Sequence, residues 1–177
     1  MIQMIRVDYR LLHGQVAVSW TSALGADCIL LVSDTVLNDK LRLQALSLAK
    51  PEGCKVVVKN TEDAIKALQS GVTDKYKLFV VCETIQQAGA VAKAMGVKKI
   101  NLGNVAFSED ARQVSTSVFL TPENEAYVKD LLGEGYELFI QMIPADAKTD
   151  AAKAIGSCCR QKAAGQTRRI LPRSCVS

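Results

Sequence analysis

The chain has 177 residues, 49% of them hydrophobic and 23% charged, and a formal net charge of +4. This length and composition fit one folded domain with a sizeable core, and they exclude the disordered and fibrous classes. No apolar run approaches the roughly 20 residues of a membrane-spanning helix, and the N-terminal residues do not resemble a secretory signal, so we expect a cytoplasmic protein.

The positive charge is concentrated at the C-terminal end. Residues 151–177 contain six Lys or Arg residues and no Asp or Glu, which leaves residues 1–150 with a net charge of −2. The basic character therefore gives no support to a nucleic-acid partner for the folded part. We predict a folded domain over residues 1–156 and a basic tail over residues 157–177 that is disordered or adventitious. A basic arm that meets lipid headgroups is the alternative for the tail.

The six cysteines indicate neither a disulfide framework nor a metal site. Cys28, Cys54 and Cys82 lie in or beside apolar runs without metal-ligand spacing, so we expect buried, reduced thiols. The other three lie near the C-terminus, far from the only histidine, which predicts that no zinc site forms.

In the first half of the chain, apolar runs typical of strands alternate with helical stripes. The run 28–32 is typical of a strand that is buried on both faces. Asn38 and Thr61 are the predicted caps of two helices. The expected elements are strands at 3–8, 28–32 and 55–58 and helices at 14–24, 38–49 and 61–70.

The same alternation continues in the second half. Pro122 follows Thr121 at a predicted helix start, where proline is favoured. The expected elements are strands at 78–82, 99–102, 116–119 and 136–142 and helices at 84–95 and from 121. Strands that alternate with helices through short turns predict an α/β domain whose open, mostly parallel sheet carries helices on both faces.

His13, the only histidine, follows the first predicted strand. In open parallel sheets ligands bind beyond the carboxyl ends of strands, so His13 lies where ligand chemistry is expected. The turn 9–14 matches neither the dinucleotide fingerprint nor a P-loop, so we expect no nucleotide cofactor.

The segment 8–16 combines groups that suit a phosphoryl group. Its imidazole is a nitrogen nucleophile that is substantially neutral near pH 7 and can accept and release phosphoryl. Arg10 offers charge-assisted hydrogen bonds, and the backbone N–H groups of Gly14 and Gln15 lie at a predicted helix start. Asp8 either fixes the ring tautomer or holds Arg10.

The residue pattern alone is also compatible with ordinary loop residues that have no role in catalysis. A lone histidine in a loop is more often a surface or capping residue than a nucleophile. Asp8 and Arg10 also fit a solvated pair of loop charges, and Gly14 fits an ordinary turn.

The segment 6–16 closely resembles the active-site signature of the mannose/sorbose-family enzyme IIB components of the bacterial sugar phosphotransferase system. Segments 34–51, 100–104 and 141–144 also fall in the family's order and rough spacing, and the resemblance covers about residues 1–156. It implies a fold of parallel strands with one antiparallel edge strand.

The resemblance implies a histidine that relays phosphate without a cofactor or metal. His13 would take phosphoryl on its δ1 nitrogen from a histidine of the IIA protein or domain and give it to a sugar held by the membrane components IIC and IID. The protein would then be cytoplasmic and peripherally associated with those components. The family's phosphate-binding positions match Arg10, Gly14 and Gln15, and its supporting positions match Asp8 and Arg6.

Other functions and an assembly state are compatible with the same sequence. One alternative is a regulatory module whose phosphorylated state signals sugar flux, and another is an unrelated small-molecule domain in which His13 is inert. Tyr9 stands where the family commonly has an acidic or small polar residue, which predicts altered partner contact. A homodimer is a reasonable expectation for a domain of this size, and the sugar stays open.

Overall fold

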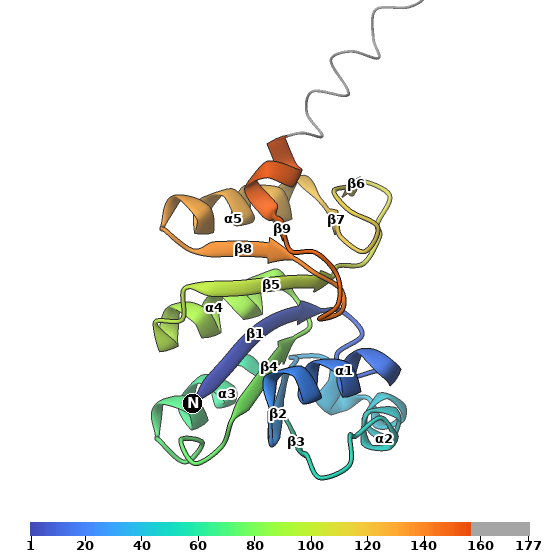
Figure 1. Ribbon diagram of the computed structural model, residues 1–177, viewed down its shortest axis with the longest axis vertical. Helices are drawn as coiled ribbons and strands as arrows, with labels where there is room; N and C mark the ends of the chain where they lie inside the picture. The colour runs from blue at the N-terminus through green and yellow to red at the C-terminus, as the bar shows by residue number, and fades with distance from the viewer. Residues whose placement is uncertain (157–177) are drawn as a thin grey trace, which may run out of the picture.

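A seven-stranded sheet with the order β3-β2-β4-β1-β5-β8-β9 runs through the computed structural model, which describes residues 1–156 (Figure 1). Neighbouring strands are parallel except β8 and β9, which are antiparallel. The predicted sheet with an antiparallel edge strand is therefore confirmed, whereas the predicted tail lies outside the described residues. The strands are β1 (Ile2–Asp8), β2 (Cys28–Val32), β3 (Lys55–Lys59), β4 (Leu78–Cys82), β5 (Lys99–Asn104), β8 (Glu137–Ile140) and β9 (Thr149–Asp150).

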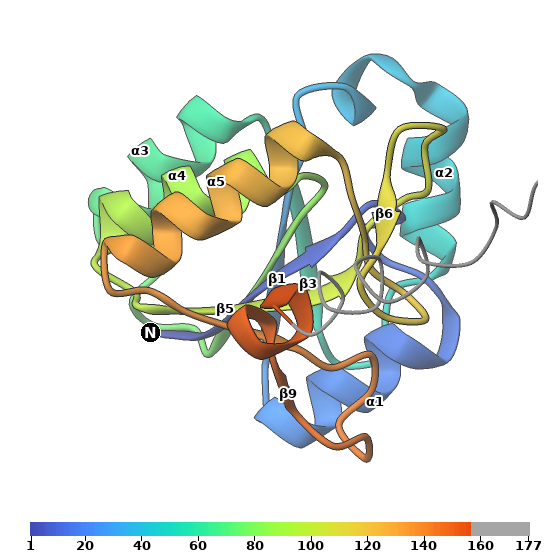
Figure 2. The same ribbon diagram turned by 90° about the horizontal axis from the view of Figure 1, so that it is seen from above.

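Helices cover both faces of the sheet, as predicted (Figure 2). On one face Trp20 and Leu46 pack into a first core cluster, and on the other Leu68, Val91 and Leu131 pack into a second. The helices of the first face are α1 (Gly14–Leu24) and α2 (Lys40–Leu48), which follows the short 3₁₀ helix η1 (Val36–Asn38). Those of the second face are α3 (Thr61–Gln69), α4 (Ile85–Met95) and α5 (Pro122–Gly133).

Two predicted helix caps are wrong by one residue. Asp39 rather than Asn38 caps α2, because its carboxylate accepts a hydrogen bond from the backbone N–H of Arg42 (3.0 Å) while Asn38 lies in η1. Asn60 rather than Thr61 caps α3 in the same way. A cap needs extended backbone as well as a side-chain oxygen, so adjacent polar residues cannot be told apart by composition.

The predicted strand at 116–119 is also misplaced. The structure has a two-stranded antiparallel ribbon, β6 (Arg112–Gln113) and β7 (Phe119–Leu120), joined by a bend over 114–117. The hydroxyl of Ser115 accepts a hydrogen bond from the backbone N–H of Ser117 (3.3 Å). Such local bonds favour a turn over a strand.

Cys28, Cys54 and Cys82 are buried free thiols, as predicted. Burial raises the pKa of each thiol, so all three are neutral near pH 7. No helix in the described part of the chain is long and apolar enough to cross a membrane. Residues 1–156 also contain no cluster of three His, Cys, Asp or Glu side chains that would hold a metal ion.

The topology places the end of β1 in a crevice at the carboxyl edge of the sheet. β1 and β5 are neighbours, yet α1 follows β1 on one face and α5 follows β5 on the other. Where the chain leaves adjacent strands toward opposite faces, a ligand site forms beyond their carboxyl ends. His13 lies there, at the end of the loop that follows β1.

Candidate functional site

Two buried leucines anchor the loop between β1 and α1. Leu11 and Leu12 pack into the core cluster that contains Trp20. The N–H of Leu11 donates to the carbonyl of Asp8 (2.8 Å), and Leu11 has a left-handed backbone (φ 59°) that leucine rarely adopts. Burial of these apolar side chains fixes the loop, which therefore presents His13 at a defined point.

His13, Asp8 and Arg6 form a chain of contacts at the end of β1. Nε2 of His13 lies 3.4 Å from Oδ2 of Asp8, and the same oxygen accepts hydrogen bonds from Nη2 (2.9 Å) and Nε (3.3 Å) of Arg6. The Asp8 and Arg6 side chains are 0% and 1% exposed, whereas that of His13 is 17% exposed. Because Nε2 faces the carboxylate, Nδ1 is the ring nitrogen left for an incoming group.

Groups from β5 and from the segment after β8 hold the other side of Arg6. Nη1 donates to Oδ1 of Asn101 (2.7 Å) and to the carbonyl of Gln141 (3.1 Å), and the guanidinium lies 5.7 Å from the centre of the Trp20 ring. A Cβ atom at Gly103 would collide with this guanidinium, so any other residue there would displace the Arg6 side chain. Figure 1 shows the orange segment between β8 and β9 passing the end of β1, which agrees with the hydrogen bond from Arg6 to the carbonyl of Gln141.

The buried pair of Arg6 and Asp8 balances its own charge. Burial lowers the pKa of Arg6, while the charge and the hydrogen bonds of Asp8 act in the opposite direction. Arginine keeps its charge in proteins, so the guanidinium compensates the carboxylate. Asp8 can therefore face His13 without an unpaired charge in the core.

The N-terminus of α1 opens beside His13. His13 is the N-cap residue, and its side chain makes no capping hydrogen bond. Gly14 begins the helix with a φ of 39°, which favours glycine. The first turn has no acidic residue, so its N–H groups, Gly14 and Gln15 included, offer the positive end of the helix to an anion. The Gln15 side chain lies outside the described part of the structure.

Arg10 is exposed beside the site, and its guanidinium has no hydrogen-bond or ion-pair partner among residues 1–156. Its backbone N–H donates to Oδ1 of Asp8 (3.2 Å). Two roles were considered for Asp8: fixing the tautomer of the His13 ring or holding Arg10. The Asp8 side chain contacts the His13 ring and does not contact the Arg10 guanidinium. The Arg10 cation remains available to an anion.

The sequence pattern assigns no role to Asn101 or Gln141 and predicts Trp20 only as a core residue. Asn101 is fully buried between the apolar residues Ile100 and Leu102, a combination that signals a buried polar contact. Trp20 is buried as predicted, and its indole N–H also donates to the carbonyl of Met142 (2.9 Å). Gln141 acts on Arg6 through its backbone carbonyl, which no side-chain pattern reveals.

The comparison with protein families covers nearly the whole described structure. Residues 2–166 match the family of the sorbose-subfamily IIB component of the phosphotransferase system (PTS). The chain belongs to this family. The match includes the His13 loop and confirms the resemblance seen in segment 6–16. It identifies a PTS component that acts in phosphoryl transfer during sugar uptake.

Individual relatives match this IIB component over most of its length. A probable phosphotransferase enzyme IIB component of Streptococcus pyogenes is 32% identical over 162 residues, which cover 88% of this chain and 99% of the relative. The crystal structure of the IIBSor domain of the sorbose permease from Klebsiella pneumoniae has a TM-score of 0.83 at 26% identity and covers 89% of this chain and 97% of that chain. The mannose-specific EIIAB component of Escherichia coli is 28% identical over 151 residues, which are 83% of this chain and 46% of that protein.

A groove of ≈ 620 Å³ runs along the carboxyl edge of this IIB component beside the His13 loop. Tyr9 from the loop, Glu83 beyond β4, Phe107 beyond β5 and Asn124 from α5 line it. The residues Tyr9 and Phe107 are 42% and 67% exposed. Exposed aromatic residues are typical of surfaces that contact another protein, and these lie next to the histidine.

Asp34, just beyond β2, links three elements at the same edge. Its carboxylate accepts hydrogen bonds from the backbone N–H (2.8 Å) and the hydroxyl (2.9 Å) of Thr61 and from Nε2 of Gln87 (3.0 Å). The backbone hydrogen bond from Thr61 lowers the pKa of Asp34, burial opposes it, and the two side-chain hydrogen bonds add to the lowering.

We expect Asp34→Asn to remove a pH-dependent part of the stability. Because the folded pKa lies below the unfolded value of about 3.9, the ionised carboxylate stabilises the fold above that value, and the contribution is lost as the pH falls through the folded pKa. Urea unfolding of both proteins should give free energies that differ most at neutral pH, and the difference should shrink as the pH falls below the unfolded value of about 3.9. A difference that stays constant with pH would contradict this expectation.

Proposed function

We propose that His13 accepts a phosphoryl group on Nδ1 and passes it to a sugar, which makes this chain a protein-phosphohistidine–sugar phosphotransferase. The contact of Nε2 with Asp8 (3.4 Å) carries the proposal, because it leaves Nδ1 as the nucleophile. His13 is the only histidine of the chain, at the carboxyl edge of a parallel sheet. Membership of the PTS family supports a phosphorylated intermediate.

Asp8 supports both halves of the reaction through the imidazole. In the first half the Nδ1 lone pair attacks the phosphorus of the donor phosphohistidine, the donor N–P bond breaks, and its electron pair returns to the donor ring. The His13 ring is then an imidazolium with its proton on Nε2, which the Asp8 carboxylate stabilises. In the second half a sugar hydroxyl oxygen attacks the phosphorus, the N–P electron pair returns to Nδ1, and the hydroxyl proton passes to solvent.

Positive groups of this chain meet the transferring phosphoryl group. The backbone N–H groups of Gly14 and Gln15 provide fixed dipoles, and the Arg10 guanidinium provides an exposed cation. Negative charge spreads over the phosphoryl oxygens during transfer, and each ~1.4 kcal/mol of additional stabilisation there raises the rate about tenfold. Arg6 stays on Asp8 and serves the ring rather than the phosphate.

The donor in this proposal is a IIA protein or domain, and the acceptor is a sugar bound by membrane IIC and IID components. The IIB family of this chain supports both partners, as does the E. coli mannose-specific relative whose name joins IIA and IIB. The protein then works on the cytoplasmic side, peripherally bound to the membrane components. A homodimer is part of the proposal, and light scattering of the purified protein tests it.

A two-step transfer assay tests this function. Radiolabelled phospho-IIA is mixed with the purified chain, and the labelled chain is then added to membranes that contain IIC, IID and candidate sugars. The proposal requires label on this chain and then on a sugar. If label reaches the chain but no sugar, although the same membranes are active with their own IIB component, the regulatory function would replace the proposed transfer to sugar.

We expect Arg10→Ala to slow phosphorylation more than roughly tenfold, and Arg10→Lys to slow it less. The anion exists only during and after transfer, so the defect is kinetic and docking of unphosphorylated IIA changes little. An exposed arginine with solvated contacts would contribute at most about 1 kcal/mol. Rapid-quench measurements with phospho-IIA give the rates.

The matched control for Arg10 is Arg42→Ala. Arg42 is an arginine at the same edge of the sheet, but its guanidinium is paired with Glu83 (2.8 Å). We expect its phosphorylation rate to stay near that of the wild type. Equal rates for Arg10→Ala and wild type in both half-reactions would make Arg10 an ordinary surface residue.

A further inference from the structure

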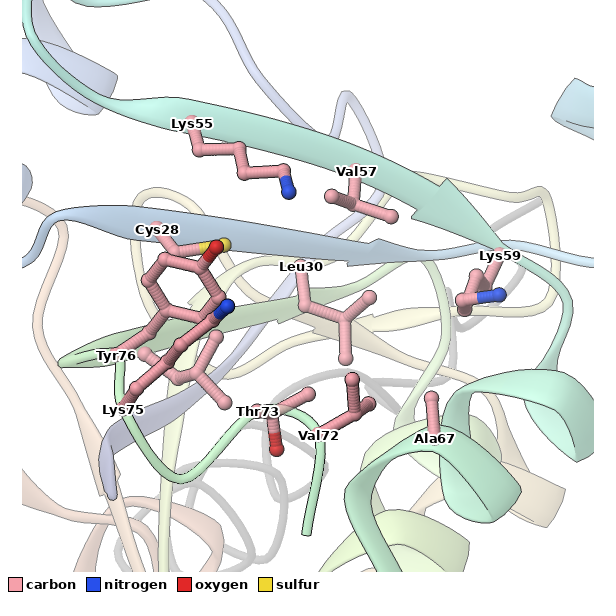
Figure 3. A pocket seen from close by; sticks show the side chains of 11 residues that line it. Cys28, Leu30, Lys55, Val57, Lys59, Ala67, Val72, Thr73, Lys75 and Tyr76 are labelled. Carbon is pink, nitrogen blue, oxygen red and sulfur yellow. The ribbon is translucent and has the colours of Figure 1, made fainter. Parts of the chain in front are cut away.

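A second cavity lies away from His13, against the edge strand β3 (Figure 3). It measures ≈ 220 Å³ and is bounded by β2, β3, the start of β4, the end of α3 and the loop 70–77. Every residue of β3 remains at least partly exposed, whereas β2 and β4 are buried throughout, so the helices leave this edge incompletely covered. The cavity is therefore a feature of the open sheet edge, separate from the phosphoryl site.

The strand register gives the cavity an apolar floor. Cys28 pairs with Lys55 and Leu30 pairs with Val57, so their side chains share one face of the sheet. Burial raises the pKa of the Cys28 thiol, which is neutral and adds to the apolar floor. Val72, which is 61% exposed, stands on the wall opposite β3 (Figure 3).

Three lysines surround this floor. Lys55 and Lys59 lie on β3 on either side of Val57, on the face that looks into the cavity, and Lys75 comes from the loop (Figure 3). No Asp or Glu lines the cavity, and none of the three ammonium groups has an ion-pair partner among residues 1–156. The cavity thus combines an apolar interior with an unbalanced positive charge.

Tyr76 keeps two of these cations over the cavity. The Nζ atoms of Lys55 and Lys75 lie 5.4 Å and 5.2 Å from the centre of its ring. Cation–π attraction at these distances holds the ammonium groups beside the ring. The aromatic ring also forms one wall of the cavity, as Figure 3 shows.

We propose that this cavity binds a small amphipathic monocarboxylate, with its apolar part on Leu30, Val57 and Leu78 and its carboxylate between Lys55 and Lys75. The volume is below the roughly 300–1,000 Å³ of sites for drug-sized ligands, so the ligand is a short alkyl or phenylalkyl acid. A sugar or sugar phosphate does not fit, because the floor would leave its hydroxyl groups without hydrogen-bond partners. The site goes beyond phosphoryl transfer and involves none of its residues.

Octanoate is the probe, and 1-octanol is the uncharged comparison. In two-dimensional amide NMR spectra of the full chain, octanoate should cause saturable shifts confined to β2, β3, the start of β4, the end of α3 and the loop 70–77, with none at Gly14. Octanol should bind at least about tenfold more weakly, since it lacks the charge that meets the lysines. Equal affinity for octanol, or unsaturable shifts spread over the surface, would overturn the proposal.

Two kinds of variant separate the contribution of the lysine charges from that of the space inside the cavity. Lys55→Ala combined with Lys75→Ala should weaken octanoate binding at least about tenfold, whereas Lys98→Ala should leave it unchanged. Lys98 is the matched control because it lies 4.0 Å from the Tyr136 ring but outside this cavity. Ala67→Phe should fill the cavity from α3 and abolish binding of both compounds, with thermal unfolding as the check on folding (Figure 3). Wild-type affinity in the double lysine variant would overturn the proposal.

Discussion

We expect His13→Ala to take up no phosphate from phospho-IIA and to transfer none to sugar. The chain has no other histidine to serve as an alternative nucleophile. The fold should survive, because the side chain contacts Asp8 only at 3.4 Å and makes no capping bond, so the loss of stability should stay near about 0.5 kcal/mol. Radiolabel transfer and thermal unfolding, measured on the same preparation, check both parts.

The chemical character of the label and a control variant sharpen this result. Phosphate on a histidine is labile in acid and stable in base, so the wild-type label should show this pattern. Ser19→Ala changes α1 one turn beyond the site, where the hydroxyl bonds only to the carbonyl of Val16, and should be labelled normally. Label on His13→Ala would move the nucleophile elsewhere and would undo the proposed function.

The alternation of strands and helices was predictable from sequence mainly because the two strands that are buried throughout each carry a continuous apolar run. β2 and β4 are buried at every position, so their runs stand out. The errors fall where local hydrogen bonds decide between neighbours, as at the caps Asp39 and Asn60 and at the bend before β7. The residue types on either side of each of these boundaries are similar, so only the backbone conformation decides where an element begins or ends.

The motif around His13 was recognisable from the sequence, but the contacts that hold it in place were not. His13 and Asp8 lie five positions apart in one motif, so a local pattern brings them together. Arg6, by contrast, meets Asn101 and Gln141, which lie 95 and 135 positions away. These contacts depend on the pairing of β1 with β5 and of β5 with β8, which a single sequence does not specify.

The largest expected loss of stability follows from Arg6→Met. This change leaves the Asp8 carboxylate, which is fully buried, without its counter-charge, and such a loss costs about 3–5 kcal/mol. Lys99→Met is the control, since the Lys99–Glu137 pair is about two-thirds exposed on both sides and should contribute at most about 1 kcal/mol. Urea unfolding measures both. We also expect phosphorylation of Arg6→Met to slow more than roughly tenfold, because Asp8 no longer holds a defined position beside Nε2.

The double variant Arg6→Met with Asp8→Leu separates stability from catalysis. Removing both charges removes the unpaired carboxylate, so the double variant should be more stable than Arg6→Met alone. It should still be less stable than wild type, because Oδ1 of Asn101 loses its donor, at about 1–3 kcal/mol. Phosphorylation should not recover, since no carboxylate then faces Nε2 of His13. From the single to the double variant, the stability would thus rise while the phosphorylation rate would stay low. A double variant that regains the wild-type phosphorylation rate would show that Asp8 and Arg6 only stabilise the fold and that His13 reacts without them.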